Sequence, residues 1–441
     1  MASTSNVRLD SNSFQTAIND DSNDQIDLVG GPFAVIESDP GVFTSLTRKL
    51  GVKHLEIVEV YDIEPWAVDH LNPYGLVFCF RWRKDTHRPA DFKDPAAEHV
   101  WFANQLSDDA CASQAILNIL FNCSNVDIGR ELSEFKEYTR EMSPKMKGLA
   151  ISNSSVIRNT HNSLARPADI RGADNVLATA ILDAAKKKEK TKRGSNPPPN
   201  KRAKTKKAPA EEGDEETYHF IGYVPAYGKV WELDGLKSGP LEVGDVSTAT
   251  EWMDVVRPAL RTKMRKYGGG GDDGGHDIRF NLLAIVDDAY EKASDEWEYW
   301  KSERRQLERR LDEGWQKEVD PTLLSAAANV FDGGGGQKFA PDFASKRNDR
   351  DWQILNMDQD GLRRAWEQCV SNAIKAKVVL EEELTKARRD HVGFFFVSVF
   401  LSEFFLQTDH VKRTHDYEPF FVEFLKCLKD EGHLTGLLAK N

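Results

Sequence analysis

The stretch Gln105-Leu-Ser-Asp-Asp-Ala-Cys111-Ala-Ser-Gln-Ala-Ile-Leu-Asn-Ile-Leu120 decides the fold and carries the most informative chemistry of the chain. A short polar approach leads into Cys111, and apolar residues then recur at helical spacing. The pattern predicts a helix with Cys111 in its first turn, where free backbone N–H groups and the helix dipole favour a thiolate. Gln105, six residues earlier, offers an amide donor for a developing oxyanion. Taken alone, however, a cysteine among apolar neighbours is more often a small core residue.

A second stretch, far downstream, changes that interpretation. Residues 218–225 and 228–235 both alternate like strands, and the short polar join between them predicts a β-hairpin. His219 would then lie near the start of one strand and Asp234 near the end of its neighbour. A cysteine at a helix N-terminus facing a paired His and Asp is the arrangement of nucleophile, base and orienting group in a cysteine protease.

The residues Gln105, Cys111, His219 and Asp234, separated by six and by fifteen positions within each pair, resemble the ubiquitin C-terminal hydrolase family of cysteine peptidases (peptidase family C12). The resemblance covers roughly residues 31 to 290, apart from an insertion, and resumes near the C-terminus. Five neighbouring motifs agree with it: Glu37-Ser-Asp-Pro-Gly-Val-Phe-Thr44, Met146-Lys-Gly-Leu-Ala150, His161-Asn-Ser-Leu-Ala-Arg166, Glu232-Leu-Asp-Gly235 and Ile278-Arg-Phe-Asn281.

The resemblance implies an α/β (α+β) architecture, the papain-like cysteine peptidase fold, with an antiparallel sheet flanked by helices and followed by a helical C-terminal extension. It implies Cys111 as the nucleophile, His219 as general base and proton donor, Asp234 as the residue that orients His219, and Gln105 as the oxyanion stabiliser. The expected substrates are ubiquitin and ubiquitin conjugates. The sequence departs from the family at Asp109, where an asparagine is usual, and a negative charge there opposes thiolate formation.

Two other classes of function remain open at this point. A ubiquitin-binding scaffold without activity would keep the fold but lose a catalytic residue, whereas all four are present here. A papain-like protease of general specificity would need an open cleft, and the family's crossover loop above the active site blocks folded substrates.

Composition narrows the class of partner. The formal net charge is −12, but residues 186–207 alone carry +10, so the remainder carries −22. This acidic body argues against direct nucleic-acid binding and suits a basic partner such as the arginine-bearing tail of ubiquitin. The cysteines are odd in number and show no CxxC spacing: Cys79, Cys111, Cys123, Cys369 and Cys427. This pattern indicates neither a disulfide framework nor a zinc site, so we expect no metal or cofactor and a reducing intracellular compartment.

Composition and resemblance together predict the following organisation. The expected segments are a disordered leader (1–30), the catalytic domain (31–290) with a long basic disordered crossover-loop insertion (167–217), a helical hairpin or coiled-coil stalk (291–392), a Phe-rich insertion (393–411) and a C-terminal tail that binds an adaptor (412–441). Within the catalytic domain, Asp39-Pro40 is a typical helix start, 55–61 and 75–82 are typical buried strands, and 252–267 is a typical helix.

The insertion contains two basic clusters, 186–193 and 201–207, separated by a short Pro-rich spacer. This spacing is typical of a bipartite nuclear import signal, and a solvated charge run is the alternative. We therefore expect the protein in both the nucleus and the cytoplasm.

The tail carries an aromatic face formed by Tyr417, Phe420, Phe421 and Phe424. It resembles the tail domain of the long members of the family, most closely the proteasome-associated ones. In those relatives the tail docks on an adaptor domain, so the resemblance implies a proteasomal ubiquitin receptor as partner. The alternative is a Polycomb-type chromatin factor, which would make the protein a histone deubiquitinase.

The run Phe394-Phe-Phe-Val-Ser-Val-Phe-Leu-Ser-Glu-Phe-Phe-Leu406 interrupts an otherwise charged helical region. It is too short to cross a bilayer, which needs about 20 residues, so no membrane partner is expected. Excising 393–411 would join Arg389-Asp-His-Val392 to Lys412 and restore one polar helix. We predict that this segment is an unspliced intron in the gene model. A peptide from it in mass spectra of the endogenous protein would exclude that origin and favour an apolar insertion that packs on the tail.

Overall fold

The computed structural model describes residues 31–81, 95–193, 218–247, 251–267, 280–331, 338–390 and 417–430. Within these residues an antiparallel six-stranded sheet forms the centre of the catalytic domain, in the order β1-β6-β2-β3-β4-β5. The strands are β1 (Leu55–Glu59), β2 (Gly75–Arg81), β3 (Tyr218–Ala226), β4 (Lys229–Leu233), β5 (Leu241–Asp245) and β6 (Phe280–Asp287).

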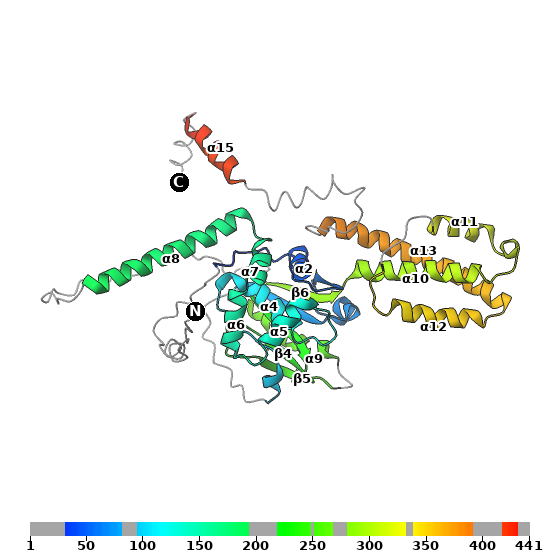
Figure 1. Cartoon of the computed structure of the whole chain (residues 1–441), viewed down its shortest axis with the longest axis horizontal. Helices are drawn as coiled ribbons and strands as arrows, with labels where there is room; N and C mark the ends of the chain where they lie inside the picture. Colours follow the sequence, from blue (N-terminus) through cyan, green and yellow to red (C-terminus); the bar gives the residue numbers. More distant parts are fainter. Residues whose placement is uncertain are drawn as a thin grey trace, which may run out of the picture.

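The two faces of the sheet are both covered, which explains why β2 and β6 are almost continuously apolar. Along β2, Val77 and Cys79 point into one apolar cluster and Leu76, Phe78 and Phe80 into the other. The first cluster is covered by α2 (Pro40–Lys49), α4 (Cys111–Leu120), α5 (Gly129–Tyr138), α6 (Pro144–Asn153) and α7 (Ser155–Asn162), and the second by α3 (Pro65–Val68) and α9 (Trp252–Tyr267). The expected antiparallel sheet with flanking helices is confirmed (Figure 1).

Local sequence signals account for several of these elements. Asp39 caps α2 by accepting a hydrogen bond from Val42 N–H at 3.1 Å, with Pro40 in the first turn, as its sequence predicts. The turn between β3 and β4 places Tyr227 and Gly228 at positive φ, the conformation that a tight hairpin requires.

Helix α8 (Pro167–Arg193) protrudes from the catalytic domain (Figure 1). The prediction of a disordered insertion over 167–217 is therefore wrong for residues 167–193, although 194–217 lie outside the described residues. The Ala-, Leu- and Lys-rich run 177–190 consists largely of strong helix formers, and their helix propensity outweighs the repulsion between its like charges.

The C-terminal extension is more elaborate than two helices joined by a loop. Helices α10 (Ala289–Glu308) and α13 (Gln359–Asp390) pack together as expected, but η4 (Trp315–Glu318), α11 (Pro321–Val330) and α12 (Phe343–Leu355) lie between them in the chain. Leu307, Ile354, Trp366 and Val370 share one buried cluster with residues of α11. The intervening helices thus complete a small core, which a two-helix stalk lacks.

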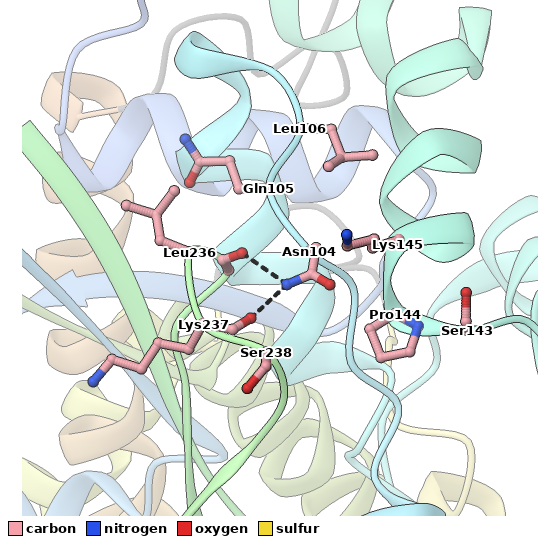
Figure 2. A pocket seen from close by; sticks show the side chains of 10 residues that line it. Asn104, Gln105, Leu106, Ser143, Pro144, Lys145, Leu236, Lys237 and Ser238 are labelled. Carbon is pink, nitrogen blue, oxygen red and sulfur yellow. Dashed lines mark hydrogen bonds between the residues drawn. The ribbon is translucent and has the colours of Figure 1, made fainter. Parts of the chain in front are cut away.

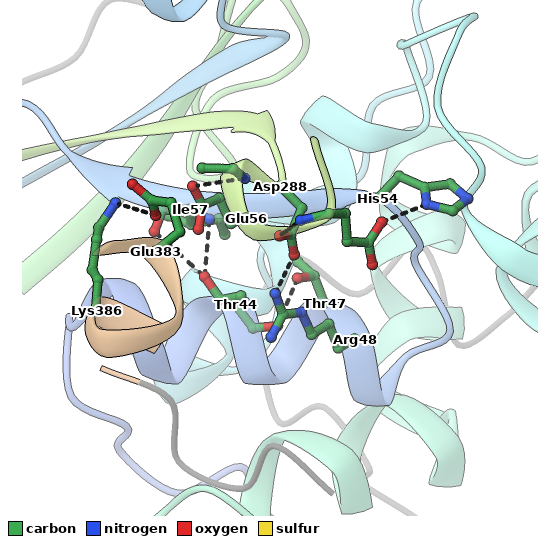
Figure 3. Close-up of polar contacts among 11 residues, drawn as sticks. Thr44, Thr47, Arg48, His54, Glu56, Ile57, Asp288, Glu383 and Lys386 are labelled. Atoms are coloured by element: carbon green, nitrogen blue, oxygen red, sulfur yellow. Dashed lines mark hydrogen bonds and ion pairs between the residues drawn. The ribbon is translucent and has the colours of Figure 1, made fainter. Parts of the chain in front are cut away.

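This extension meets the catalytic domain at β1 and α2 (Figure 3). Glu56 of β1 is buried, accepts a hydrogen bond from Ala289 N–H at 3.3 Å and lies near Lys386 of α13. Arg48 of α2 pairs with Asp288, the N-cap residue of α10. Burial and the Asp288 carboxylate raise the pKa of Glu56 to about 7. The extension is therefore anchored by a partly buried ionic junction.

The remaining tail residues in the structure form α15 (Glu418–Asp430), whose aromatic side chains are exposed. The leader 1–30 and the Phe-rich segment 393–411 lie outside the described residues, so the expectations for both stay predictions. Among the helices that the structure describes, none is long and apolar enough to span a bilayer. The same residues contain no cluster of three potential metal-binding side chains.

Candidate active site

Cys111 is the first residue of α4 and follows a single 3₁₀ turn, η3 (Asp108–Ala110). The sequence therefore predicted its position correctly. The N–H groups of Cys111 and Ala112 face the sulfur and lower the pKa of the thiol. Burial has a larger opposite effect, to which Cys79 and Asp109 add, so the pKa is raised to about 12. The expected thiolate is thus not favoured in the substrate-free enzyme, and the thiol needs a base.

An amide ladder along α4 and the turn that follows it positions the segment that carries Gln105. Gln114 and Asn118 lie four residues apart on one side of α4, and Asn122 continues the same spacing just beyond the end of the helix. Asn118 Oδ1 accepts from Ala103 N–H at 2.9 Å, and Asn122 Oδ1 accepts from Trp101 N–H at 2.8 Å. These bonds hold residues 101–103 extended along the helix that begins with the nucleophile.

Sequence reasoning missed this ladder, although its signal was visible as three amides at i, i+4 and i+8, two on an otherwise apolar helix and one directly after it. Gln114 Nε2 and Asn118 Nδ2 both donate to Ala103 O, so the backbone of this one residue is fixed from both sides. All three amide side chains form hydrogen bonds with backbone groups of the extended segment. Their role is to set the distance between Gln105 and the helix terminus.

A second contact ties Gln105 to the end of the hairpin. Gln105 N–H donates to Gly235 O at 2.8 Å, and Asn104 Nδ2 donates to the same oxygen at 3.1 Å (Figure 2). A Cβ atom on Gly235 would lie 2.9 Å from Gln105 Cβ, closer than real Cβ contacts allow. Glycine at position 235 therefore permits the close approach that brings Gln105 beside Asp234.

The hairpin unites His219 and Asp234 as the sequence predicted. Gly222 pairs with Leu233, so the start of β3 and the residue after β4 lie at the same end of the sheet. A hydrogen bond of 2.7 Å joins His219 Nε2 to Asp234 Oδ1, and each residue is only 3% exposed. Burial raises the pKa of Asp234, but the hydrogen bonds from His219 and Leu236 N–H outweigh it and hold the pKa below its usual value.

The Asp234 carboxylate therefore stays ionised and fixes the imidazole through Nε2, which leaves Nδ1 for the substrate side. Within the described residues, no hydrogen bond joins Cys111 Sγ to His219. The structure brings together His219 with Asp234 and Gln105 with Gly235. Catalytic hydrogen bonds are often long in a free enzyme and tighten when the substrate binds.

The second histidine of this region, His161, has a structural environment. Its Nδ1 lies 2.7 Å from Ser113 Oγ of α4, and its Nε2 lies 2.8 Å from Ala34 O. In the next residue, Asn162 Oδ1 accepts a hydrogen bond from Ala34 N–H at 3.0 Å, and Asn162 Nδ2 donates one to Pro32 O at 3.1 Å. Burial lowers the pKa of His161 to about 4, so its imidazole is neutral. His161 and Asn162 thus connect the end of α7 to an N-terminal strap, residues 32–38.

Asp109 gives a direct test of the thiol's electrostatics. Asp109→Asn removes a charge that raises the pKa of Cys111, so the thiol should ionise at lower pH. We expect the acidic limb of the kcat/KM profile to move to lower pH by about 0.5 unit, with an increase of about threefold in the rate at pH 7. Asp109→Glu keeps the charge and is the control. An unchanged profile, or one moved to higher pH, would show that Asp109 does not act on the nucleophile.

A buried His–Asp pair, a cysteine on the first turn of a helix and an antiparallel sheet between helical layers define a papain-like cysteine peptidase. The family model "Ubiquitin carboxyl-terminal hydrolase, family 1" matches residues 33–265, and the model "Ubiquitin carboxyl-terminal hydrolases" matches residues 406–434. The chain belongs to the ubiquitin carboxyl-terminal hydrolase family and is a cysteine-type deubiquitinase.

Relatives match along most of the chain. Ubiquitin carboxyl-terminal hydrolase isozyme L5 of Dictyostelium discoideum is 28% identical and aligns over 92% of this chain and 94% of its own. Ubiquitin carboxyl-terminal hydrolase ubh-4 of Caenorhabditis elegans is 31% identical over 92% of this chain and 91% of its own. The crystal structure of the Trichinella spiralis UCH37 catalytic domain bound to ubiquitin vinyl methyl ester is 30% identical, with a TM-score of 0.44, and covers 59% of this chain and 98% of its own.

Proposed function

We propose that the chain cleaves the bond after the C-terminal glycine of ubiquitin through an acyl-enzyme formed on Cys111. The observation that carries the assignment is the buried 2.7 Å contact between His219 and Asp234, at one end of strands β3 and β4 and near Gln105. His219 Nδ1 takes the thiol proton and then gives it to the leaving amine. Asp234 holds the imidazole in the tautomer that this transfer needs.

Gln105 and the backbone N–H of Cys111 then donate to the oxyanion of the tetrahedral intermediate. The rigidity of the Gln105 segment supports this role, because it is fixed by α4 on one side and by Gly235 on the other. Water attacks the acyl-enzyme in the second half of the reaction, with His219 as base, and releases free ubiquitin. A fluorogenic C-terminal amide of ubiquitin tests the reaction without any conjugated protein.

We further propose that the enzyme works in ubiquitin-dependent protein catabolism through a proteasomal ubiquitin receptor. One observation supports this partner over a chromatin factor, and a second supports docking on an adaptor of either kind. The relative named isozyme L5 aligns over 92% of this chain, a coverage that fits the proteasome-associated subfamily indicated by the sequence. Helix α15 presents an exposed aromatic face, with Phe420 62% exposed, which is a typical docking surface.

The aromatic face can be tested separately from catalysis. Phe420 and Phe424 stack on each other with ring centroids 6.1 Å apart, so Phe420→Ala with Phe424→Ala removes the centre of the surface. We expect at least a hundredfold weaker adaptor binding, because buried aromatic anchors dominate such interfaces at roughly 2 kcal/mol or more each. Pull-down and titration calorimetry with isolated adaptor domains measure the loss.

The matched control is Glu423→Ala with Lys426→Ala, which removes an ion pair of 3.4 Å from the same helix and leaves both phenylalanines. This control should bind the adaptor normally, and both double variants should cleave the fluorogenic amide at the basal rate. Equal adaptor binding by the two variants would mean that the aromatic face is not the docking site. Preferential capture of a Polycomb-type adaptor would favour the chromatin assignment.

We also propose that the protein is present in the cytoplasm and is imported into the nucleus, because residues 186–207 contain two basic clusters typical of a bipartite import signal. Deletion of these residues should remove nuclear fluorescence of a tagged chain while the fluorogenic amide is still hydrolysed. Persistent nuclear fluorescence would mean that the clusters are only a solvated charged segment.

A further inference from the structure

A groove of about 580 Å³ lies beside Gln105 and has no part in the mechanism above (Figure 2). Its walls come from three segments, residues 104–106, 143–145 and 235–238. The first segment carries the oxyanion donor, the second is the start of α6, and the third follows directly on Asp234. Of the four catalytic positions, Gln105 therefore lines the groove itself, and Asp234 directly precedes one of its walls.

The sheet order places this groove on one side of the reacting centre. The N-terminal strap, residues 32–38, lies toward β6, where Asn281 Nδ2 donates to Ser38 O at 3.4 Å. The strands that follow β6 in the sheet are β2, β3 and β4, in that order. His219 lies on β3, and Asp234 directly follows β4. The strap and the groove thus flank His219 from opposite sides.

The strap side is also the side on which α7 ends. His161 and Asn162, the last residues of α7, bond the strap at Ala34 and Pro32. In the arrangement we propose, the ubiquitin tail runs along the strap and occupies this side. Because acyl and leaving groups lie on opposite sides of the attacked carbonyl, the leaving lysine points toward the groove beside Gln105.

The groove is walled by apolar and cationic groups. Leu106, Pro144 and Leu236 supply apolar surface, and Leu236 is 48% exposed. Lys145 is exposed in the first turn of α6, where the helix dipole adds to its positive charge, and among the described residues it has no ion-pair partner. Lys237 also lines the groove but lies 3.9 Å from Glu232, so Lys145 is the dominant charge.

We propose that this groove is the leaving-group subsite, which receives the residues that flank the modified lysine of the conjugated protein, and that Lys145 gives it a preference for acidic flanks. The inference rests on the proposed function. An acidic residue next to the lysine would lie over apolar surface close to an unpaired cation, whereas a basic residue would meet like charge. Preference at this site selects conjugates by their sequence around the ubiquitylated lysine.

The test uses the full chain and three isopeptide conjugates of ubiquitin with short peptides of equal length. The residues on both sides of the modified lysine are Glu in one peptide, Ala in the second and Lys in the third. Each kcat/KM is divided by that for the fluorogenic amide, so that only the contribution of the flanks remains. We expect the wild type to prefer the Glu flanks over the Lys flanks by about fivefold, which is the scale of partly exposed charge pairs, and to lose most of this preference in 1 M salt.

Lys145→Glu should reverse the preference, since it replaces the positive charge in the groove by a negative one. An acidic residue in the first turn of α6 is compatible with the helix, and a melting curve checks the fold. Lys317→Glu makes the same change in net charge on the exposed surface of the C-terminal extension and should leave the ratio as in the wild type.

The outcomes separate the two claims. Cleavage of the fluorogenic amide with equal rates for all three peptides would overturn the subsite, and so would a preference that Lys145→Glu leaves intact. A preference altered equally by Lys317→Glu would assign the effect to the net charge of the protein and overturn the role of Lys145. No cleavage of the fluorogenic amide by the wild type would instead contradict the proposed hydrolase function itself.

Discussion

Replacing Cys111 by alanine should abolish hydrolysis of ubiquitin C-terminal amides and leave ubiquitin binding close to normal. Cys111 begins α4, and alanine is an excellent helix former, so the helix and the amide ladder that holds Gln105 should persist. Without the thiol, no acyl-enzyme can form, and we expect kcat to fall by more than about a thousandfold. Steady-state turnover and calorimetric titration with ubiquitin measure the two quantities.

Other cysteines should not substitute for this nucleophile. The thiols of Cys79, Cys123 and Cys369 share the high pKa that burial gives Cys111, but none of them stands at the start of a helix: Cys79 lies in β2, Cys123 follows the end of α4, and Cys369 lies inside α13. Cys427 is exposed on α15, so Cys427→Ala is the matched control and should be fully active. Residual turnover by the Cys111→Ala enzyme above roughly one part in a thousand would falsify the assignment.

The His219–Asp234 pair should give the second-largest effects, with an order that the geometry dictates. His219→Ala removes the proton acceptor for a thiol whose pKa is about 12, so kcat should fall nearly as far as in Cys111→Ala. Asp234→Asn keeps a hydrogen-bonding side chain of the same shape but loses the charge that orients the imidazole. We expect its defect to be smaller than that of His219→Ala by about tenfold or more, as for the orienting residue of other triads.

Because both residues are buried, the measurement needs a stability control. Truncating one partner leaves the other unpaired, which costs about 3 kcal/mol or more of unfolding free energy. Rates should therefore be compared per folded molecule, with denaturant midpoints for each variant. Equal defects in His219→Ala and Asp234→Asn would mean that Asp234 does more than orient the ring, and a greater defect in Asp234→Asn would contradict these roles.

Much of the site follows from local sequence pattern, and the hairpin shows why. A strand–turn–strand pattern fixes its own register, so the alternation on either side of residues 226–228 was enough to place His219 and Asp234 at the same end of the hairpin, where their side chains meet. Gln105 and Cys111 are close in sequence and share one helix start, which the apolar spacing revealed. That the helix of Cys111 and the hairpin of His219 and Asp234 belong to one site followed from the resemblance to the family. The sequence pattern alone cannot show which helix lies against which hairpin.

Features that depend on packing between distant segments were not predicted. The side chains of Gln114, Asn118 and Asn122 bond a backbone segment that was not recognised as extended, so their purpose could not be deduced from helical spacing. The sign of the shift in the pKa of Cys111 depends on burial, which sequence reports only roughly. Helix α8 was not predicted, because the dense charge near its C-terminal end is typical of disorder, whereas its Ala- and Leu-rich part favours a helix.

In the reaction we propose, Cys111 attacks the C-terminal carbonyl of ubiquitin with His219 as its base. Covalent trapping tests this step directly: the full chain is treated with a ubiquitin whose C-terminus carries an electrophile, and the adduct and its peptides are identified by mass spectrometry. We expect one ubiquitin per chain, attached to Cys111, with trapping slowed strongly in His219→Ala and absent in Cys111→Ala. Attachment to any other cysteine, or full-rate trapping without His219, would contradict it.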